Sequence, residues 1–330
     1  MKKILNRLTQ YETLTEKESR DIIIDISEGK LNTSEISSFL TIFMIRNITI
    51  EELNGFRKAL IELSLKIDLN EFDPIDLCGT GGDEKDTFNI STLASFVTAG
   101  SGVKVAKHGN YGVSSSCGSS NVLEYLDLKF NNDSDKIRKA VDKANICFLH
   151  APLFHPAMKN VAPVRKELGL KTFFNMLGPM VNPSMPKKQV VGVYNLELAR
   201  IYNYLYQTTD INYNIIHSID GYDEISLTKG TKVYSRESEF ILDSKDFSLK
   251  DIDSKNIRGG KDIESSSKIF MDVLNGEASN DQENVVCANA SLAIAISKNI
   301  SIIEAFDNAK ESIKTKNALK CFNELINIMK

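Results

Sequence analysis

The chain has 330 residues, of which 42% are hydrophobic and 25% charged, the composition of an ordinary globular protein. Its 40 basic and 44 acidic residues give a formal net charge of −4, which argues against broad binding to nucleic acid or to an anionic membrane surface. A chain of this length exceeds the usual size of a single hydrophobic core, so we expect a large domain and a smaller one.

Residues 1–66 have the pattern of short amphipathic helices. Residues 15–18, 32–35 and 49–52 each have the form, or nearly the form, of a capping box, in which a polar side chain and a glutamate satisfy the first amides of a helix. Apolar residues recur at helical spacing, as in Ile36, Leu40 and Phe43. We expect a small all-helical domain over residues 1–66, joined by part of residues 165–185, with apolar faces suited to a homodimer interface.

From residue 74 the chain alternates between strands and helices. Apolar runs predict strands over the ranges 74–78, 103–106, 146–149, 189–193 and 213–217. Helices are predicted between them, and two more, 283–297 and 301–330, close the chain. This alternation predicts an α/β domain, residues 74–330, with a mainly parallel central sheet flanked by helices. Ligands of such sheets bind at the carboxyl ends of the strands, where the glycine-rich turns of this sequence fall.

The first predicted strand runs into a glycine-rich turn, residues 79–83, and a helix opens near Ser91. A strand, a glycine-rich turn and a helix N-terminus together present several backbone amides to an anion. The spacing fits neither Gly-x-Gly-x-x-Gly nor Gly-x-x-x-x-Gly-Lys-Ser/Thr, so the glycines alone leave an ordinary tight turn and a phosphate-binding loop equally open. Polar side chains at Thr87, Asn89 and Thr92 favour phosphate binding.

A second polar loop, residues 107–119, follows the next strand, and the pair Asp223-Glu224 follows a later one. Carboxylates with a hydroxyl such as Ser91 are hard oxygen ligands that suit Mg²⁺. Alone, such a pair is most often a solvated turn, but two anion-binding loops at the same edge favour a metal site. We find no Ser-His-Asp or Cys-His arrangement and no histidine pair at helical i, i+4 spacing. Neither a covalent nucleophile nor a zinc site is therefore expected.

Cysteine usage and the lack of long apolar runs bear on the compartment. The five cysteines are scattered and form no Cys-x-x-Cys pair, so we expect reduced thiols rather than disulfides. Residues 1–7 lack the apolar core of a signal peptide, and no run approaches the length of a membrane span. The sequence predicts a cytoplasmic protein without a membrane partner.

Several ordered segments of the sequence match one known family. They are Gly79–Asp83, Asn89–Thr92, Lys107–Asn110, Ser114–Ser119, His155–Lys159, Val164–Gly169, Thr172–Asn175, Leu177–Pro179, Asn182–Pro183 and Gly221–Ser226. With these segments the sequence resembles the anthranilate phosphoribosyltransferases over essentially its whole length. The resemblance implies transfer of the phosphoribosyl group of 5-phosphoribosyl-1-pyrophosphate to the amine of anthranilate, in tryptophan biosynthesis. It also implies a homodimer formed through the helical domain, and it allows a glutaminase subunit of anthranilate synthase as a partner.

The resemblance also implies which residues act. Those matching the family's phosphoribosyl-pyrophosphate site are Gly79, Thr80, Gly81, Gly82, Asp83, Thr87, Asn89, Ile90, Ser91, Thr92, Lys107, Gly109, Asn110, Ser114, Ser115 and Ser119. Those matching its anthranilate site are Gly79, His108, Asn110, Ala151, Pro152, Arg165 and Gly178. Two Mg²⁺ ions are implied, one held by Ser91 and Glu224 and the other by Asp223 and Glu224. Donors and metal at the pyrophosphate would stabilise the charge that develops there as the bond to the ribose breaks.

The sequence departs from the family mainly in the second loop. Tyr111, Ser116 and Asn121 stand where the family usually has Arg, Lys and Asp, and His150 replaces a usual phenylalanine. Each missing charge-assisted contact to phosphate would cost about 1–2 kcal/mol. We therefore expect weaker or differently tuned binding of phosphoribosyl pyrophosphate, not a new reaction, and we assign no catalytic role to His150.

Three other interpretations remain at this point. A pyrimidine nucleoside phosphorylase would also join a helical domain to an α/β domain, but Asp223-Glu224 and the pair Asn110 and Arg165 argue against it. A non-catalytic relative that binds nucleic acid is opposed by the net charge of −4. A structural dimer with a vestigial site predicts no ligand binding that depends on Mg²⁺.

Overall fold

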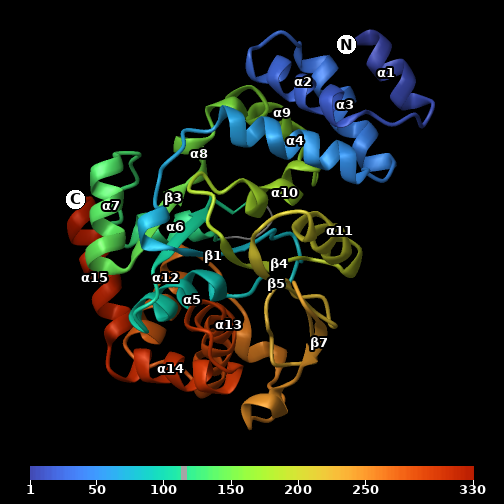
Figure 1. Cartoon of the computed structure of the whole chain (residues 1–330). Coiled ribbons are helices and arrows are strands. Elements are labelled where there is room, and N and C mark those ends of the chain that lie inside the picture. The colour runs from blue at the N-terminus through green and yellow to red at the C-terminus, as the bar shows by residue number, and fades with distance from the viewer. Residues whose placement is uncertain (113–116) are drawn as a thin grey trace. The chain divides into compact units, whose positions relative to one another are not determined.

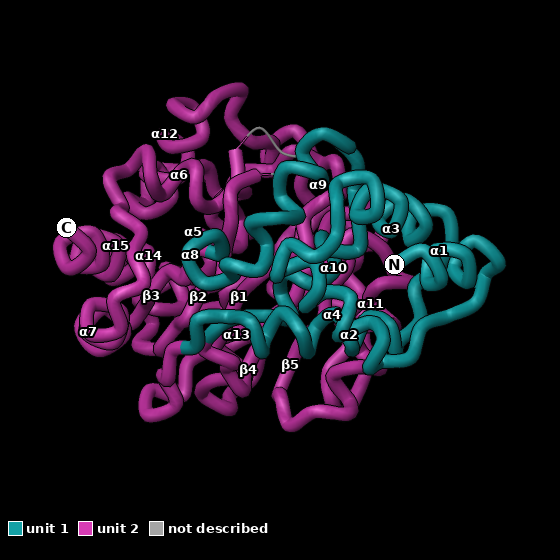
Figure 2. The backbone as a smooth tube through the Cα atoms, turned by 90° about the horizontal axis from the view of Figure 1, so that it is seen from above, with its two compact units in different colours: residues 1–66, 151–183 teal, residues 67–150, 184–330 magenta. Residues whose placement is uncertain are grey.

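Two separate stretches, residues 1–66 and 151–183, build unit 1, and residues 67–150 and 184–330 build unit 2 (Figure 2). The computed structural model describes residues 1–112 and 117–330. The second stretch of unit 1 begins at residue 151, earlier than the expected segment 165–185. It follows directly after the strand that ends at His150.

Unit 1 is built from helices whose starts follow from local sequence. Its helices are α1 (Lys2–Thr9), α2 (Glu16–Ser27), α3 (Thr33–Ile45), α4 (Ile50–Leu63), α8 (Ala151–Phe154), α9 (Ala162–Leu168) and α10 (Phe174–Leu177), with 3₁₀ turns at Pro156–Asn160 and Gly178–Val181. The predicted capping boxes of α2, α3 and α4 are confirmed, with Thr15, Asn32 and Thr49 as the N-caps.

Aromatic side chains join the two stretches of unit 1. Phe173 stacks on Phe56 of α4 with ring centroids 4.4 Å apart, and it meets Phe39 and Phe43 of α3 edge to face at 6.0 and 5.3 Å. All four rings are buried. Offset stacking and edge-to-face contacts are the favoured geometries for such rings, so this cluster fixes residues 151–183 onto the N-terminal helices.

Unit 2 is organised around one seven-stranded sheet (Figure 1). Its strands are β1 (Ile75–Gly79), β2 (Val105–Gly109), β3 (Ile146–His150), β4 (Lys188–Gly192), β5 (Asn212–Ser218), β6 (Thr231–Ser235) and β7 (Glu239–Leu242). They lie in the order β3-β2-β1-β4-β5-β6-β7. Strands β1 to β5 pair in parallel, and β6 and β7 add an antiparallel edge. The predicted mainly parallel sheet is confirmed.

The helices of unit 2 flank this sheet. They are α5 (Ile90–Gly100), α6 (Ser119–Tyr125), α7 (Ser134–Ala144), α11 (Leu196–Gln207), α12 (Ile263–Leu274), α13 (Asn280–Lys298), α14 (Ile302–Lys314) and α15 (Asn317–Met329), with short 3₁₀ turns at Asn70–Phe72, Ser244–Phe247 and Ser254–Ile257. Helices α5 and α13 pack against each other and against β1 (Figure 1). The single closing helix expected over residues 301–330 is wrong, because the chain breaks at Lys316, whose φ of 58° ends α14 and starts α15.

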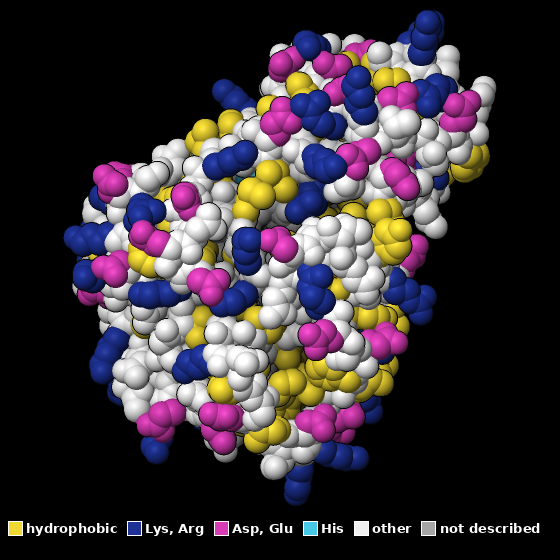
Figure 3. Space-filling view, viewed as in Figure 1, with side chains coloured by type: hydrophobic (Ala, Val, Ile, Leu, Met, Phe, Trp, Pro, Cys, Tyr) yellow, Lys and Arg dark blue, Asp and Glu magenta, His cyan; other side chains and the backbone are white. Residues whose placement is uncertain are grey.

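Charged side chains of both signs are interspersed on the face that Figure 3 shows, in keeping with the small net charge. In the part of the chain that the structure describes, no single helix is long and apolar enough to span a membrane. Only α13 with α14, bent by 114°, passes that test as a pair.

Candidate active site

The site lies in unit 2 where three neighbouring parallel strands end. Gly79, the last residue of β1, is in register with Gly192 at the end of β4, and Gly192 is in register with Ile216 of β5. The chain leaving β1 forms the glycine-rich turn and then α5, and the chain leaving β5 reaches Asp223 and Glu224. Because the strands are parallel, these segments meet at the carboxyl ends of the strands, as expected.

The glycine-rich turn and the two carboxylates are bonded directly to each other. The backbone N–H of Gly81 donates to Asp223 Oδ2 at 2.9 Å. The N–H of Ser91 donates to Glu224 Oε1 at 3.0 Å, and the Thr87 hydroxyl donates to Glu224 Oε2 at 3.3 Å. These bonds bring together segments that lie more than 130 residues apart in the chain. The structure thus unites the predicted anion-binding turn with the predicted metal pair.

Both carboxylates are destabilised as anions. Each residue is only 8% exposed. Burial raises the pKa of Asp223 to about 7, and the neighbouring Asp83 carboxylate adds to the rise. Burial, followed by repulsion from Asp223 and Asp83, raises the pKa of Glu224 well above its ordinary value. A buried carboxylate pair of this kind is stabilised by a proton or by a positive partner, and a divalent cation with a preference for oxygen is one such partner.

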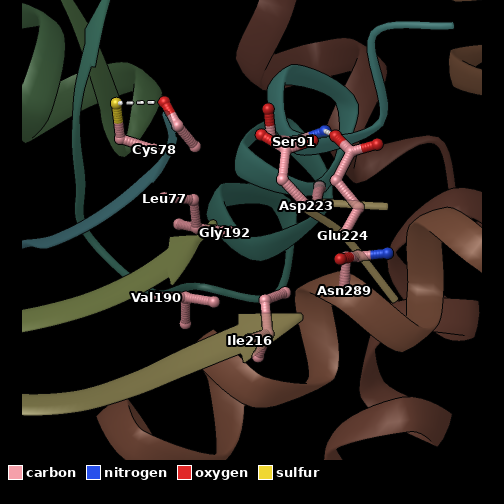
Figure 4. Close-up of a pocket in the computed structure, with 11 residues that line it drawn as sticks. Leu77, Cys78, Ser91, Val190, Gly192, Ile216, Asp223, Glu224 and Asn289 are labelled. Carbon is pink, nitrogen blue, oxygen red and sulfur yellow. Dashed lines mark hydrogen bonds between the residues drawn. The ribbon is translucent and has the colours of Figure 1, made fainter. Parts of the chain in front are cut away.

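A small pocket lies beside this pair (Figure 4). Apolar strand residues form one side of it, and Ser91, Asp223, Glu224 and Asn289 supply polar groups. Figure 4 shows the two carboxylates next to Ser91, with the Asn289 amide on the side of Glu224. Among the described residues no three His, Cys, Asp or Glu side chains form a metal-binding group. A magnesium ion here would therefore take its remaining ligands from hydroxyl, water or substrate oxygens, which suits an ion that keeps several waters.

Two glycines make room for Asp223. A Cβ on Gly192 would lie 1.6 Å from the Asp223 carbonyl oxygen, and one on Gly79 would lie 2.7 Å from Asp223 Oδ2. In the turn itself, Gly81 and Gly82 have φ of 62° and 84°, which favours glycine. The strand ends therefore require glycine because the backbone approaches Asp223 closely, and the turn favours glycine because of its positive φ.

The second loop is joined to the first. Asn89 Nδ2 donates to the carbonyl oxygen of Cys117 at 3.0 Å, and Ser119 Oγ donates to that of Asn110 at 3.1 Å. Lys107 is buried, and its ammonium donates to the Leu77 carbonyl at 2.6 Å, so it spans from β2 to β1. Ile90, Thr92 and Gly109 lie at the start of α5 and the end of β2. Ser114 and Ser115, together with Ser116, fall outside the described residues.

Two of the residues that depart from the family pattern, Tyr111 and His150, contact each other. The Tyr111 hydroxyl lies 3.3 Å from both carboxylate oxygens of Glu124, and its ring meets His150 edge to face at 4.9 Å. His150 stacks on Phe130 at 4.4 Å, and its Nδ1 lies 2.9 Å from Ser120 Oγ. Burial lowers the pKa of His150 to about 4, so this ring is neutral near pH 7.

Asn121 closes the base of the second loop. Its Oδ1 accepts from the backbone N–H of Gly112 and from that of Gly118, each at 3.0 Å. A Cβ on Gly118 would lie 2.1 Å from Gly112 N, so the two ends of the loop touch. A neutral amide therefore bonds to both Gly112 and Gly118. This role could not be predicted from the sequence, because the two donors are backbone groups.

The residues that the resemblance assigns to the anthranilate site belong to both units. Gly79, His108 and Asn110 belong to unit 2, and Ala151, Pro152, Arg165 and Gly178 belong to unit 1. In unit 2, the His108 N–H donates to the buried carboxylate of Asp76 at 3.1 Å, which fixes the backbone at the end of β2.

Arg165 uses only part of the hydrogen-bonding capacity of its guanidinium group within the described residues. Its Nη2 donates to Asn175 Oδ1 at 3.1 Å, and the group lies over the ring of Phe174 at 5.5 Å. Its Nε is buried and has no hydrogen-bond partner among the described residues. Burial lowers the pKa of Arg165, yet guanidinium stays charged in proteins. A half-buried cation with an unused donor is suited to a planar carboxylate.

The raised pKa values predict how stability depends on pH without metal. A carboxyl whose folded-state pKa is raised stabilises the fold while it is protonated. That stabilisation is lost as pH rises from about 3.8, the ordinary pKa of Asp223, through its folded-state pKa of about 7. The melting temperature in EDTA is therefore expected to fall between about pH 4 and 7, and saturating Mg²⁺ is expected to reduce this fall. Thermal scans of the protein and of a variant carrying Asp223→Asn with Glu224→Gln test the assignment. A wild-type slope that the variant retains would contradict it.

Comparisons with known proteins agree with this architecture. Residues 2–64 match the model of the glycosyl transferase family helical bundle domain, and residues 71–319 match that of its a/b domain. The anthranilate phosphoribosyltransferase of Christiangramia forsetii is 60% identical over 98% of both chains.

Two solved structures of the Saccharomyces cerevisiae anthranilate phosphoribosyltransferase share the fold. The complex with PRPP and Mg has a TM-score of 0.91 at 27% identity, and the complex with 4-fluoroanthranilate has 0.88 at 26%. Both matches cover 98% of this chain and 96% of the yeast chain. The chain belongs to the anthranilate phosphoribosyltransferase family.

Proposed function

We propose that this chain transfers the phosphoribosyl group of 5-phosphoribosyl-1-pyrophosphate to anthranilate, giving N-(5-phosphoribosyl)anthranilate and pyrophosphate, in tryptophan biosynthesis. The observation that carries the proposal is the bonding of the glycine-rich turn to the buried pair Asp223 and Glu224. A relative 60% identical over 98% of both chains has the same activity in its name.

The leaving group is handled by the first and second loops. We assign pyrophosphate and ribose binding to backbone amides of residues 79–83 and to polar groups at Thr87, Asn89 and Thr92, with Ile90, Gly109, Asn110 and Ser119 beside them. Such donors hold an anion without needing to reorganise as charge develops on it, and so stabilise the transition state more than the ground state. Lys107 adds a positive charge close to the same loops. Ser114 and Ser115 are assigned to the same site on the basis of the sequence alone.

Ser91, Asp223 and Glu224 are assigned to magnesium, with two ions per site. The yeast relative was solved with PRPP and Mg, which supports this metal. When bound, the metal neutralises charge on the pyrophosphate oxygens. The chain's own contribution is to hold two carboxylates in a buried position, where their repulsion is relieved only by a cation or a proton.

We assign the acceptor to Arg165, Ala151, Pro152 and Gly178 of unit 1 and to Gly79, His108 and Asn110 of unit 2. A planar guanidinium with a buried unused donor suits the carboxylate of anthranilate. An aromatic amine is neutral at pH 7, so its nitrogen can attack the ribosyl carbon directly. The bond from that carbon to pyrophosphate breaks as the new bond forms, and the amine loses a proton afterwards. No covalent nucleophile is required.

Assembly and location are further parts of the proposal. We propose that units 1 and 2 are the two domains of the enzyme and that it forms a homodimer through unit 1, where Tyr11 and Ile45 are largely exposed. A glutaminase subunit of anthranilate synthase is a candidate partner. All five cysteines are free, which fits the reducing cytoplasm.

A substrate panel tests the function. Purified protein with Mg²⁺ and phosphoribosyl pyrophosphate is expected to consume anthranilate, which is measured by the loss of anthranilate fluorescence. In the presence of phosphate it is expected to leave uridine and thymidine intact. Phosphorolysis of a nucleoside without turnover of anthranilate would favour the phosphorylase interpretation. DNA binding that weakens steeply with salt, without any turnover, would favour the nucleic-acid interpretation.

A further inference from the structure

We propose that Asn289, in the middle of α13, is a positioning residue that fixes the backbone carrying Asp223 and Glu224. This inference rests on the proposed function, because it concerns the metal pair of that site. Asn289 lies on a different element from every residue assigned above, and it lines the same pocket (Figure 4).

The Asn289 amide pairs with the backbone of Ile225, the residue after Glu224. Its Oδ1 accepts from the Ile225 N–H at 3.0 Å, and its Nδ2 donates to the Ile225 carbonyl at 2.9 Å. The second Nδ2 proton goes to the Val285 carbonyl of α13 itself at 2.9 Å. The side chain thus gives Ile225 the donor and acceptor that a neighbouring strand would give. Asn289 is 4% exposed, so water does not compete for these bonds.

A second side chain holds the same segment from β5. Ser218 Oγ donates to the Glu224 carbonyl at 2.6 Å and accepts from the Ser226 N–H at 3.3 Å. Residues 223–226 form neither helix nor strand, so regular backbone pairing does not fix them. Asn289 and Ser218 replace that pairing from two sides. The Asp223 and Glu224 carboxylates are then aimed at the amides of Gly81 and Ser91.

Asparagine is otherwise a poor choice for this position. It has a low helix propensity, and burying its amide is unfavourable unless every group is bonded. A purely structural α13 would be better served by an apolar residue, as at its buried neighbours Cys287 and Leu292. The amide is also neutral, so it orders the segment without adding charge beside the two carboxylates. Residues that orient metal ligands typically change metal affinity by about 10–100-fold when they are replaced.

Mn²⁺ binding in the presence of pyrophosphate tests this role without turnover. Titrations followed by electron paramagnetic resonance would compare wild type with Asn289→Leu, which keeps the size and removes both bonds to Ile225. The Mn²⁺ dissociation constant is expected to rise about 10–100-fold. Ser218→Ala, which removes the opposite support, is expected to weaken Mn²⁺ binding as well. The loss of Mn²⁺ binding free energy in the double variant should be smaller than the sum of the losses in the two single variants, since both side chains hold one segment.

Ser291→Ala is the matched control. Ser291 is also buried in α13, but among the residues that the structure describes its hydroxyl bonds only to the Ala288 carbonyl of the same helix. This variant is expected to bind Mn²⁺ as wild type does. Wild-type Mn²⁺ affinity in a folded Asn289→Leu protein would overturn the inference and leave the proposed function intact. If Asn289→Leu does not fold, unchanged affinity in Ser218→Ala would overturn it. Absence of Mn²⁺ binding by wild type would reject both the inference and the metal site of the proposed function.

Discussion

Replacing Asp223 by Asn and Glu224 by Gln together is expected to lower kcat/KM for phosphoribosyl pyrophosphate by about 10³-fold or more. Such a loss corresponds to roughly 4 kcal/mol of transition-state stabilisation. The amides keep the shape of the carboxylates but no longer provide anionic oxygens for the metal. Steady-state rates of anthranilate consumption over a range of Mg²⁺ concentrations measure the effect, and the remaining rate should no longer depend on Mg²⁺.

The same double variant should be more stable than wild type when metal is absent. Two buried carboxylates with raised pKa values repel each other, and the amides remove that repulsion. Asp220→Asn is a suitable control, because Asp220 lies in the same loop but its Oδ2 accepts from the Thr228 hydroxyl. Its dependence on Mg²⁺ should match wild type. A double variant with lower stability in EDTA and near wild-type turnover would contradict the assignment.

Gly192→Ala is expected to abolish most activity and to lower the free energy of unfolding by about 3 kcal/mol. The new Cβ would lie 1.6 Å from the Asp223 carbonyl oxygen and 2.8 Å from its carbon. These are backbone atoms, so no side-chain rotation relieves the contact, and the segment carrying the metal pair must shift. Chemical denaturation and the Mg²⁺ dependence of turnover together measure the two effects.

Val191→Ala separates a shift of the metal pair from simple loss of stability. Val191 precedes Gly192 in β4 and is fully buried. The variant removes two methyl groups and leaves a small cavity, which costs about 2 kcal/mol without pushing Asp223. We expect lower stability with near wild-type kcat. If Gly192→Ala and Val191→Ala lose activity in proportion to their stability, close packing against Asp223 is not the cause.

The parts of the fold that depend on local sequence could be predicted. Capping boxes identified the starts of α2 to α4, and short apolar runs identified the parallel strands. Asp223-Glu224 and the glycine-rich turn were recognisable because each is a short motif after a strand. Their meeting at one edge follows from the parallel pairing of β1, β4 and β5.

The remaining features depend on contacts between distant residues. Asn289 bonds to Ile225 across 64 residues, and nothing near it in the sequence marks an asparagine in an apolar helix as a support for a metal pair. The contacts of Tyr111 and His150 with Glu124 and Phe130 likewise appear only when β2, β3 and α6 are packed. The break between α14 and α15 at Lys316 has no glycine or proline to signal it.

Phosphorus NMR of one reaction mixture tests the central claim most directly. The protein would be incubated with phosphoribosyl pyrophosphate, with and without anthranilate and with and without Mg²⁺. Free pyrophosphate is expected only when anthranilate and Mg²⁺ are both present, and in a 1:1 ratio to the anthranilate consumed. Pyrophosphate release that does not need anthranilate would indicate hydrolysis. No release from a folded, Mg²⁺-loaded protein would contradict the transferase assignment.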